Sequence, residues 1–378
     1  MADEISVLIV DDSALMRNLI GHMVESTPGL AVADKAMNGR FALRKIPLVN
    51  PDVIVLDLEM PEMNGIEFLK ERKKQGIAIP VIILSSIARK GAEITMEALA
   101  LGASDFVMKP HGSVSEDLTS IKDSLTNLLL VYGAQYRRRQ GKKDSAPVGG
   151  ILKKPESVAV DVGGFMKPPP AAGPVVPLRK PGKTEIIAIG ISTGGPDALR
   201  IVFANLDKDL SVPIVVVQHM PPGFTYEFAK SLDRICPLEV KEAEEGDLIR
   251  PGRILIAQGN KHLEVERKSL ASVAHLSDSP PVSGHRPSVD VLFASVAKTY
   301  SNHALGVIMT GMGRDGAEQI GAICKEGGIT LGQDEKTSVV YGMPRVAFEM
   351  GHVQEQVSLQ NMAGRICGIA KNSPAGRN

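Results

Sequence analysis

Short apolar runs alternate with amphipathic stretches through the first third of the chain. The runs are rich in β-branched residues and occupy positions 6–10, 30–36, 52–57, 81–86 and 105–110. After each run, apolar positions recur at the spacing of an α-helix, which predicts a succession of strand–helix units. This alternation indicates an α/β domain with a doubly wound parallel sheet of five strands.

The alternation breaks off in a segment rich in proline and glycine and then resumes. Residues 134–183 include three consecutive prolines at 168–170 and show little apolar periodicity, so we expect a semi-extended linker. We therefore predict one domain at 1–133 and a second, larger α/β domain at 184–378, also built on a doubly wound parallel sheet. Within this second domain, residues 237–270 look like antiparallel hairpins.

Composition narrows the classes of function. The 378 residues carry 43 Lys and Arg against 43 Asp and Glu, so no net positive field attracts nucleic acid or anionic lipid. The three cysteines lack the close spacing of a disulfide framework or a zinc site. No apolar run has the length of a signal-peptide core or a bilayer span. We expect a cytoplasmic protein without direct membrane insertion and without a nucleic-acid partner.

Acidic residues stand at the ends of two predicted strands of the first domain. Asp11 and Asp12 follow the first strand and Asp57 ends the third, so the three carboxylates should meet at one edge of the sheet. Their mutual repulsion and their hard oxygen atoms suit Mg²⁺. Ser85 and Lys109 stand at the ends of the fourth and fifth strands, where a hydroxyl and an ammonium group could hold the oxygens of a phosphoryl group on Asp57.

At these residues the first domain resembles two-component receiver domains. The resemblance is carried by the acidic pair, by Asp57 within the motif VIVLDLEMPEMNG, and by Ser85 and Lys109. It implies a flavodoxin-like fold, Mg²⁺ held by the acidic pair and Asp57, and phosphorylation of Asp57 by a histidine kinase. It also implies that Ser85 and Lys109 couple this phosphorylation to an adjacent surface, which regulates a downstream function.

Three apolar runs of the second domain end in residue types that serve nucleophilic catalysis. They end at Ser192, His219 and Asp315, and parallel strands would bring these side chains to one edge of a sheet. Residues 190–194 satisfy the GxSxG pattern between a strand and a helix. His219 could deprotonate Ser192, and Asp315 could orient the imidazole. The chain order Ser, His, Asp differs from that of an α/β-hydrolase, which indicates another fold with a convergent triad.

The glycine-rich turn at 311–316 admits two interpretations. Its backbone N–H groups could stabilise an oxyanion beside the three residues. The same turn matches GxGxxG between a strand and a helix, and Asp334 ends the next strand, as in a dinucleotide-binding fingerprint. The dinucleotide interpretation gives Asp315 no catalytic role and leaves the serine and the histidine unexplained. The catalytic interpretation therefore covers more of the sequence.

Two further histidines are weaker candidates for chemistry. His262 and His285 lie near predicted turns, and neither belongs to an HExxH motif or to a pair with metal-ligand spacing. We therefore expect each of them to make local hydrogen bonds rather than to act as a catalytic base.

Motifs spread over the second domain resemble the catalytic domain of the CheB family, the chemotaxis protein-glutamate methylesterases. These motifs are GISTGGP, QHMPPGFT, GHRPSVDVLF, MTGMGRDGA and QDEKTSVVYGMPR. Receiver, linker and these motifs follow the CheB order over nearly the whole chain. The resemblance implies a triad of Ser192, His219 and Asp315, an oxyanion donor in the Met312 amide, and no cofactor for ester hydrolysis. One stretch differs: residues 257–263 read AQGNKHL where the family more usually has Ala-Pro-Gly-Gly-x-His.

By this resemblance the chain would be a phosphorylation-regulated hydrolase. Its substrates would be glutamyl methyl esters on the cytoplasmic helices of chemoreceptors, with receptor glutamines as further substrates of the same chemistry. A chemotaxis histidine kinase is the implied phosphodonor, and phosphorylation of Asp57 would relieve a block that the receiver imposes. The alternative is a response regulator whose second domain binds a partner or a dinucleotide without catalysis.

Overall fold

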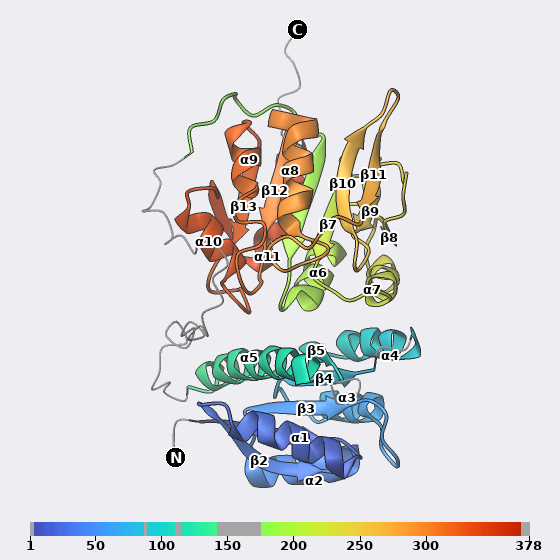
Figure 1. Cartoon of the computed structure of the whole chain (residues 1–378), viewed down its shortest axis with the longest axis vertical. Helices are drawn as coiled ribbons and strands as arrows, with labels where there is room; N and C mark the ends of the chain where they lie inside the picture. The colour runs from blue at the N-terminus through green and yellow to red at the C-terminus, as the bar shows by residue number, and fades with distance from the viewer. Residues whose placement is uncertain (1–3, 87–88, 110–114, 142–174, 372–378) are drawn as a thin grey trace. The chain divides into compact units, whose positions relative to one another are not determined.

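The chain divides into two compact units, Met1–Pro168 and Pro169–Asn378, which we describe separately. The computed structural model describes residues 4–86, 89–109, 115–141 and 175–371 (Figure 1). Most of the predicted linker, residues 142–174, lies outside the described residues. Within the described part, no helix is both long and apolar enough to cross a bilayer.

A parallel sheet of five strands forms the middle of the first unit, in the order β2-β1-β3-β4-β5. The strands are β1 (Ile5–Val10), β2 (Leu30–Ala36), β3 (Val53–Asp57), β4 (Val81–Ser85) and β5 (Asp105–Met108). All residues of β3 and β4 are buried, because helices cover both faces of the sheet. The predicted doubly wound, flavodoxin-like order is confirmed, and the carboxyl ends of all strands lie at one edge.

Five helices connect these strands. They are α1 (Ala14–Glu25), α2 (Gly39–Val49), α3 (Gly65–Lys74), α4 (Arg89–Ala100) and α5 (Ser115–Arg139). Helix α1 packs with α5, whereas α2, α3 and α4 pack in series (Figure 1). Ser13, Asn38 and Asn64 begin the first three helices, because each side chain accepts a backbone N–H of the first turn. Helix α5 continues past the predicted domain limit at 133.

The second unit is built on a parallel sheet of seven strands, in the order β14-β13-β12-β6-β7-β9-β8. The strands are β6 (Ile186–Ile191), β7 (Ile214–Gln218), β8 (Glu239–Glu242), β9 (Arg253–Ile256), β12 (Ala304–Ile308), β13 (Ile329–Gln333) and β14 (Glu355–Val357). The three central strands are wholly buried, which is why they read as unbroken apolar runs. The strand order reverses between β6 and β12, and such a switch point is where open α/β sheets place their sites.

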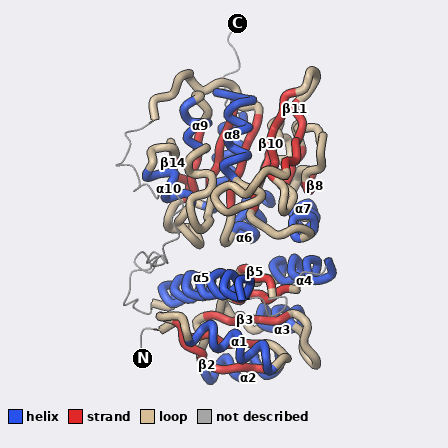
Figure 2. The backbone as a smooth tube through the Cα atoms, viewed as in Figure 1, coloured by secondary structure: helices blue, strands red, loops and turns tan. Residues whose placement is uncertain are grey.

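Helices cover the faces of this second sheet. They are α6 (Gly195–Ala204), α7 (Phe224–Asp233), α8 (Val289–Tyr300), α9 (Ile320–Lys325), α10 (Met343–Glu349) and α11 (Leu359–Lys371). Helices α8 and α9 pack together and lie in front of the sheet in Figure 2, whereas α6 packs with α7 and α11. The fold is therefore the larger doubly wound α/β domain that the alternating pattern predicts.

An antiparallel hairpin stands apart from the large sheet. It consists of β10 (His262–Arg267) and β11 (Ser272–Ser277), packs against α8, and carries at its tip Leu270, which is 98% exposed. The expected hairpin is thus confirmed, but β8 and β9 in the same region pair in parallel. Parallel pairing is possible because the loop 243–252 carries the chain back before β9 begins.

Close packing of α8 on β6 anchors the core beside the strand that leads to Ser192. Phe293 is fully buried in the main core of the second unit. A Cβ on Gly190 would lie 2.1 Å from Val289 Cγ1 and 3.1 Å from Phe293 Cζ, so only glycine lets the helix approach the strand this closely. The position of α8 therefore depends on the large side chain of Phe293 on the helix and on the absence of a side chain at Gly190 on the strand.

The substitution Phe293→Ala is expected to lower the free energy of unfolding of the second unit by about 3–5 kcal/mol, because it leaves a cavity in a packed core. Phe348→Ala serves as the control, since that ring is 48% exposed and its removal should change stability by about 0.5 kcal/mol or less. Urea titrations of the full-length protein measure both effects. Equal effects of the two substitutions would contradict the core described above.

Candidate active site

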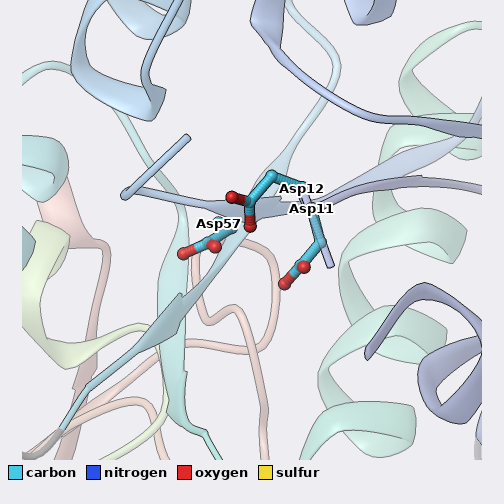
Figure 3. Close-up of side chains that lie close together, drawn as sticks. All are labelled: Asp11, Asp12 and Asp57. Carbon is cyan, nitrogen blue, oxygen red and sulfur yellow. The ribbon is translucent and has the colours of Figure 1, made fainter. Parts of the chain in front are cut away.

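Three carboxylates meet at the edge of the first sheet where β1 and β3 end. Asp11, Asp12 and Asp57 have oxygen atoms within 4.8 Å of one another (Figure 3). Lys109, which follows β5, places its Nζ 2.7 Å from Asp57 Oδ2 and 3.6 Å from Asp11 Oδ2. The structure thus brings together four of the residues that the strand ends indicated.

Burial makes this acidic cluster costly when it is ionised. Desolvation raises the pKa of Asp57 above its usual value, although Lys109 opposes the shift. Desolvation, and then the charge of Asp57, raise the pKa of Asp11. One buried oxygen, Asp11 Oδ2, has no hydrogen-bond partner among the described residues. These oxygens fit a divalent cation, which would offset the repulsion and accept Asp11 Oδ2 as a ligand.

Ser85 ends β4 at the same edge, but its hydroxyl faces helix α4. Ser85 Oγ lies 2.6 Å from Thr95 Oγ1, and the Thr95 hydroxyl lies 2.7 Å from Gly91 O, to which it donates. In the part of the chain that the structure describes, no hydrogen bond joins Ser85 to Asp57. Thr95 is fully buried and carried no sequence signal beyond the helical period, so sequence reasoning missed it.

Ser192, His219 and Asp315 form one hydrogen-bonded chain beside the carboxyl ends of β6, β7 and β12. Ser192 Oγ lies 3.0 Å from His219 Nδ1, and His219 Nε2 lies 2.7 Å from Asp315 Oδ2. When Nε2 donates its proton to the carboxylate, the Nδ1 lone pair is free to accept the proton of the serine hydroxyl. The serine is therefore placed for activation by a base that a carboxylate orients.

The buried carboxylate of Asp315 is surrounded by hydrogen-bond donors. It accepts from Ser288 Oγ at 2.7 Å, from Val289 N at 2.7 Å and from Asp290 N at 3.2 Å. These donors lie at the beginning of α8, where free N–H groups and the helix dipole stabilise an anion. Burial alone would raise the pKa of Asp315, but hydrogen bonds from His219, Ser288 and Val289 lower it to about 2. Asp315 is therefore ionised at neutral pH.

Small residues bring the backbone around Ser192 into place. Gly194 has a φ of 75°, in the left-handed region, so the chain turns sharply between β6 and α6. Pro196 lies in the first turn of α6, where a missing N–H breaks no helical bond. A Cβ on Gly311 would lie 2.8 Å from Ser192 Cβ, so glycine lets the turn at 311–313 pack directly beside the serine.

Two backbone N–H groups near Ser192 have no acceptor among the described residues. One belongs to Thr193, which follows the serine, and the other to Met312, in the turn that packs beside it. N–H groups at these positions can donate to the oxygen of a tetrahedral intermediate. The Met312 amide was expected from the sequence and the Thr193 amide was not, although the GxSxG pattern itself makes the residue after the serine a usual donor.

His285 stacks on His219, a contact that the sequence did not reveal. The two ring centroids are 3.8 Å apart and the rings are 12° from parallel. Desolvation, and then the neighbouring His219, lower the pKa of His285 to about 4, so an uncharged ring faces the base at neutral pH. His262 behaves as expected, because its ring nitrogens pair locally with Ser288 N and Pro280 O at 3.2 and 3.1 Å.

The unusual stretch at 257–263 is accommodated by Asn260. Its φ of 65° lies in the left-handed region, which asparagine tolerates better than most residues. Its Oδ1 accepts hydrogen bonds from Arg286 Nε at 3.1 Å and from Arg286 Nη2 at 2.8 Å. The asparagine thereby ties this loop to the segment that carries His285.

The geometry of the glycine-rich turn does not favour dinucleotide binding. Asp315 lies buried within the turn, and a Cβ on Gly316 would lie 2.3 Å from Val289 Cγ1, so this glycine serves packing against α8. Asp334 Oδ1 accepts from Thr337 N at 3.1 Å and from Thr337 Oγ1 at 2.5 Å, which closes its own turn. The acidic residue assigned to a ribose in that interpretation is therefore already engaged.

In the His285→Phe variant, the free energy of unfolding of the second unit is expected to decrease less steeply as the pH is lowered. Because the pKa of His285 falls from 6.5 to about 4 on folding, the unfolded chain binds a proton in that interval and the folded protein does not. The free energy of unfolding therefore decreases as the pH is lowered through this window. Phenylalanine keeps the stacked ring and removes this contribution, which urea titrations at several pH values would measure.

His275→Phe is the matched control for this experiment. A hydrogen bond from His275 to Glu245 raises the pKa of His275. Removal of this histidine should therefore make the free energy of unfolding decrease slightly more steeply as the pH is lowered. If the free energy of unfolding of His285→Phe depends on pH in the same way as that of the unchanged protein, the imidazole of His285 is not buried in its neutral form.

Comparisons with known proteins cover both units. Residues 187–366 match the CheB methylesterase family and residues 7–120 match the response regulator receiver domain. The protein-glutamate methylesterase/protein-glutamine glutaminase of Treponema denticola is 63% identical over 371 residues, which are 96% of this chain and 98% of that protein. Its counterpart from Pyrococcus horikoshii is 39% identical over 362 residues, covering 96% and 92% of the two chains.

Two solved structures from Thermotoga maritima are also similar. The CheB methylesterase catalytic domain is 37% identical and covers 49% of this chain and 98% of its own, with a TM-score of 0.48. The response regulator domain of CheB is 41% identical and covers 35% of this chain and 97% of its own, with a TM-score of 0.32. Given its near-complete alignment with full-length relatives, the chain belongs to the CheB methylesterase family, with a receiver domain ahead of the catalytic domain.

Proposed function

We propose that this chain hydrolyses methyl esters of glutamate side chains on chemoreceptors, and that Ser192, His219 and Asp315 carry the reaction. The supporting observation is the hydrogen-bonded chain from Ser192 Oγ through the imidazole to the Asp315 carboxylate. A hydroxyl, an oriented base and a buried anion are the groups that acyl transfer to a serine requires. The relatives that align with this chain are named for the same reaction.

In the first half of the reaction, Ser192 Oγ attacks the ester carbonyl while His219 Nδ1 takes the hydroxyl proton. The carbonyl oxygen becomes an oxyanion, which the N–H groups of Met312 and Thr193 stabilise. His219 then gives the proton to the methoxy oxygen, methanol leaves, and the glutamyl group remains as an ester on the serine. Asp315 stabilises the imidazolium in between.

In the second half, water attacks the glutamyl ester and His219 accepts the proton of that water. The second oxyanion collapses, Ser192 regains its proton from the imidazolium, and the receptor side chain leaves as a carboxylate. A glutamine amide presents the same carbonyl with ammonia as the leaving group. Deamidation of receptor glutamines therefore belongs to the same proposal, and either reaction adds one negative charge to the receptor.

The receiver is proposed to control this hydrolysis through phosphorylation of Asp57 by a chemotaxis histidine kinase. We assign Mg²⁺ to Asp11, Asp12 and Asp57, because it prefers carboxylate oxygens and tolerates additional phosphate and water ligands. When bound, it would neutralise the carboxylates and the incoming phosphoryl group. Lys109 and Ser85 would hold the phosphoryl oxygens. The Ser85 hydroxyl would leave Thr95 to do so, which alters a contact of α4.

The same proposal includes the limits of the domains and the cellular compartment of the protein. We assign the receiver to 1–133, the linker to 134–183 and the hydrolase to 184–378, which enclose the family matches at 7–120 and 187–366, and the first residues of this linker, up to Arg139, form the end of α5. The proposed kinase and the signalling helices of chemoreceptors act in the cytoplasm, so we place the protein there. A net charge of zero offers no attraction for nucleic acid.

The substitution Ser192→Ala should abolish methanol release from methylated receptor signalling domains, lowering kcat by at least about a thousandfold because no hydroxyl remains to form the acyl-enzyme. Gas chromatography of released methanol measures the rate. Ser269→Ala, on the exposed tip of the β10–β11 hairpin, is the control and should retain full activity. Full activity in folded Ser192→Ala would defeat the proposed mechanism.

A small-molecule phosphodonor with Mg²⁺ should raise the rate of methanol release, and Asp57→Asn should remove this increase because the amide cannot accept a phosphoryl group. Chelation of the metal by EDTA should remove it as well, since the carboxylate cluster then lacks its cation. Asp123→Asn, at an exposed position of α5, should retain the increase. Activation that survives in Asp57→Asn would contradict the assigned phosphorylation site.

A further inference from the structure

Gln218, the last residue of β7, joins the backbones of the serine and the histidine. Its side-chain Nε2 lies 3.0 Å from Ser192 O and 3.1 Å from His219 O. The two hydrogens of one NH₂ group thus bond to the carbonyls of the two residues that exchange a proton. The Gln218 side chain is only 2% exposed, so water does not compete for these bonds.

The backbone pairing of β6 with β7 stops at these two strand ends. The pairing of β6 with β7 ends with Ile191 opposite Gln218, and the final bond, from His219 N to Ile191 O, is long at 3.3 Å. Beyond it the two chains separate, because one turns into α6 and the other enters the loop at Pro221. The Gln218 side chain therefore supplies a cross-link beyond the last backbone bond of the sheet.

The surroundings fix the direction of the Gln218 amide. Two carbonyl oxygens face one end of it, and only the NH₂ group can donate to both. The other end, Oε1, is buried without a hydrogen-bond partner among the described residues. A Cβ on Gly195 would lie 1.9 Å from that oxygen, so glycine leaves the room that the amide needs. Gly195 N itself donates to Ser192 O at 2.8 Å.

An unpaired buried amide oxygen opposes folding, and an apolar side chain of the same shape would avoid that cost. Such a side chain would, however, take away the donor that His219 O receives from Gln218, so the amide links the two backbone segments at the cost of its own unpaired oxygen. We infer that Gln218 is a positioning residue that sets the distance between Ser192 Oγ and His219 Nδ1 by holding both carbonyls. This inference rests on the proposed catalytic roles of the serine and the histidine.

The kinetic consequence follows from where the amide lies. Gln218 holds backbone atoms behind the reacting groups, so its loss should displace the serine and the base from each other without changing the surface that binds the receptor. A small misplacement of reacting atoms lowers the rate of the chemical step steeply. The loss of the amide should therefore lower kcat and leave KM nearly unchanged.

The test compares Gln218→Met and Gln218→Glu in the full-length protein, with methanol release as the readout. Methionine keeps the length of the side chain without a donor and should lower kcat about 10- to 100-fold, with KM changed by less than about twofold. Glutamate keeps the shape but turns carboxylate oxygens toward the two carbonyls. Because its protonated form regains one donor, the ratio of its kcat to that of the unchanged protein should rise as the pH falls.

Gln354→Met is the matched control. The Gln354 amide also joins neighbouring segments of the second unit, accepting from Thr330 N at 3.1 Å and donating to Gly328 O at 3.3 Å, and it has no hydrogen bond to Ser192 or His219. Its loss should leave kcat unchanged. Circular dichroism verifies the fold of each variant. If Gln218→Met does not fold, Gly195→Ala replaces it, because the added methyl pushes against Gln218 Oε1 and should lower kcat in the same way.

The outcomes separate the inference from the function on which it rests. Unchanged kcat in a folded Gln218→Met protein, together with loss of activity in Ser192→Ala, would overturn the positioning role alone. Retained activity in Ser192→Ala would overturn the catalytic proposal itself. A lower kcat at constant KM in Gln218→Met, with a pH-dependent ratio for Gln218→Glu, would support the inference.

Discussion

The second unit depends on a negative charge that is held out of reach of water. A buried carboxylate is tolerated only where donors surround it, and Asp315 receives them from His219 and from the residues that open α8. The same bonds fix the helix on the sheet and the imidazole toward Ser192. The stability of this region and the geometry of the proposed reaction therefore both depend on this anion.

The acidic edge of the first unit uses the opposite arrangement. There, burial raises the pKa values of Asp11 and Asp57, the charge of Asp57 raises that of Asp11 further, and Asp11 Oδ2 has no hydrogen-bond partner among the described residues. At Asp315 the donors prevail and the pKa falls to about 2. Both sites lie at the carboxyl ends of parallel strands, so the backbone setting is the same. An edge with many hydrogen-bond donors around a carboxylate suits proton transfer within the protein. An edge with several carboxylates and few donors suits an added cation.

Much of this architecture could be predicted because buried parallel strands leave unbroken apolar runs whose ends mark one edge of a sheet. That logic places Ser192, His219, Asp315 and Asp57 at strand ends from the sequence alone. It could not reveal contacts that depend on how distant segments pack, such as the stacking of His285 on His219. The amide of Gln218 was hidden for the same reason, since nothing in the run VPIVVVQH indicates where the side chain points.

The parallel pairing of β8 with β9 was also beyond the sequence, because alternating apolar positions look alike in parallel and antiparallel edge strands. The bond between Ser85 and Thr95 escaped prediction on similar grounds, since a threonine on the buried face of a helix resembles any other core position. In both cases the missing information is tertiary: it concerns which segment lies next to which.

The order of the strands also determines where this fold can accept inserted residues. β12 returns to lie beside β6, so the strands that lead to Ser192 and Asp315 are direct neighbours although they are distant in the chain. The β10–β11 hairpin comes between them in sequence, yet its tip at Leu270 is exposed to solvent. Extra residues at the tip would increase the entropic cost of closing this loop only slightly, and they would not separate β6 from β12. New recognition sequence could therefore evolve at the hairpin tip while the hydrolytic centre stays as it is.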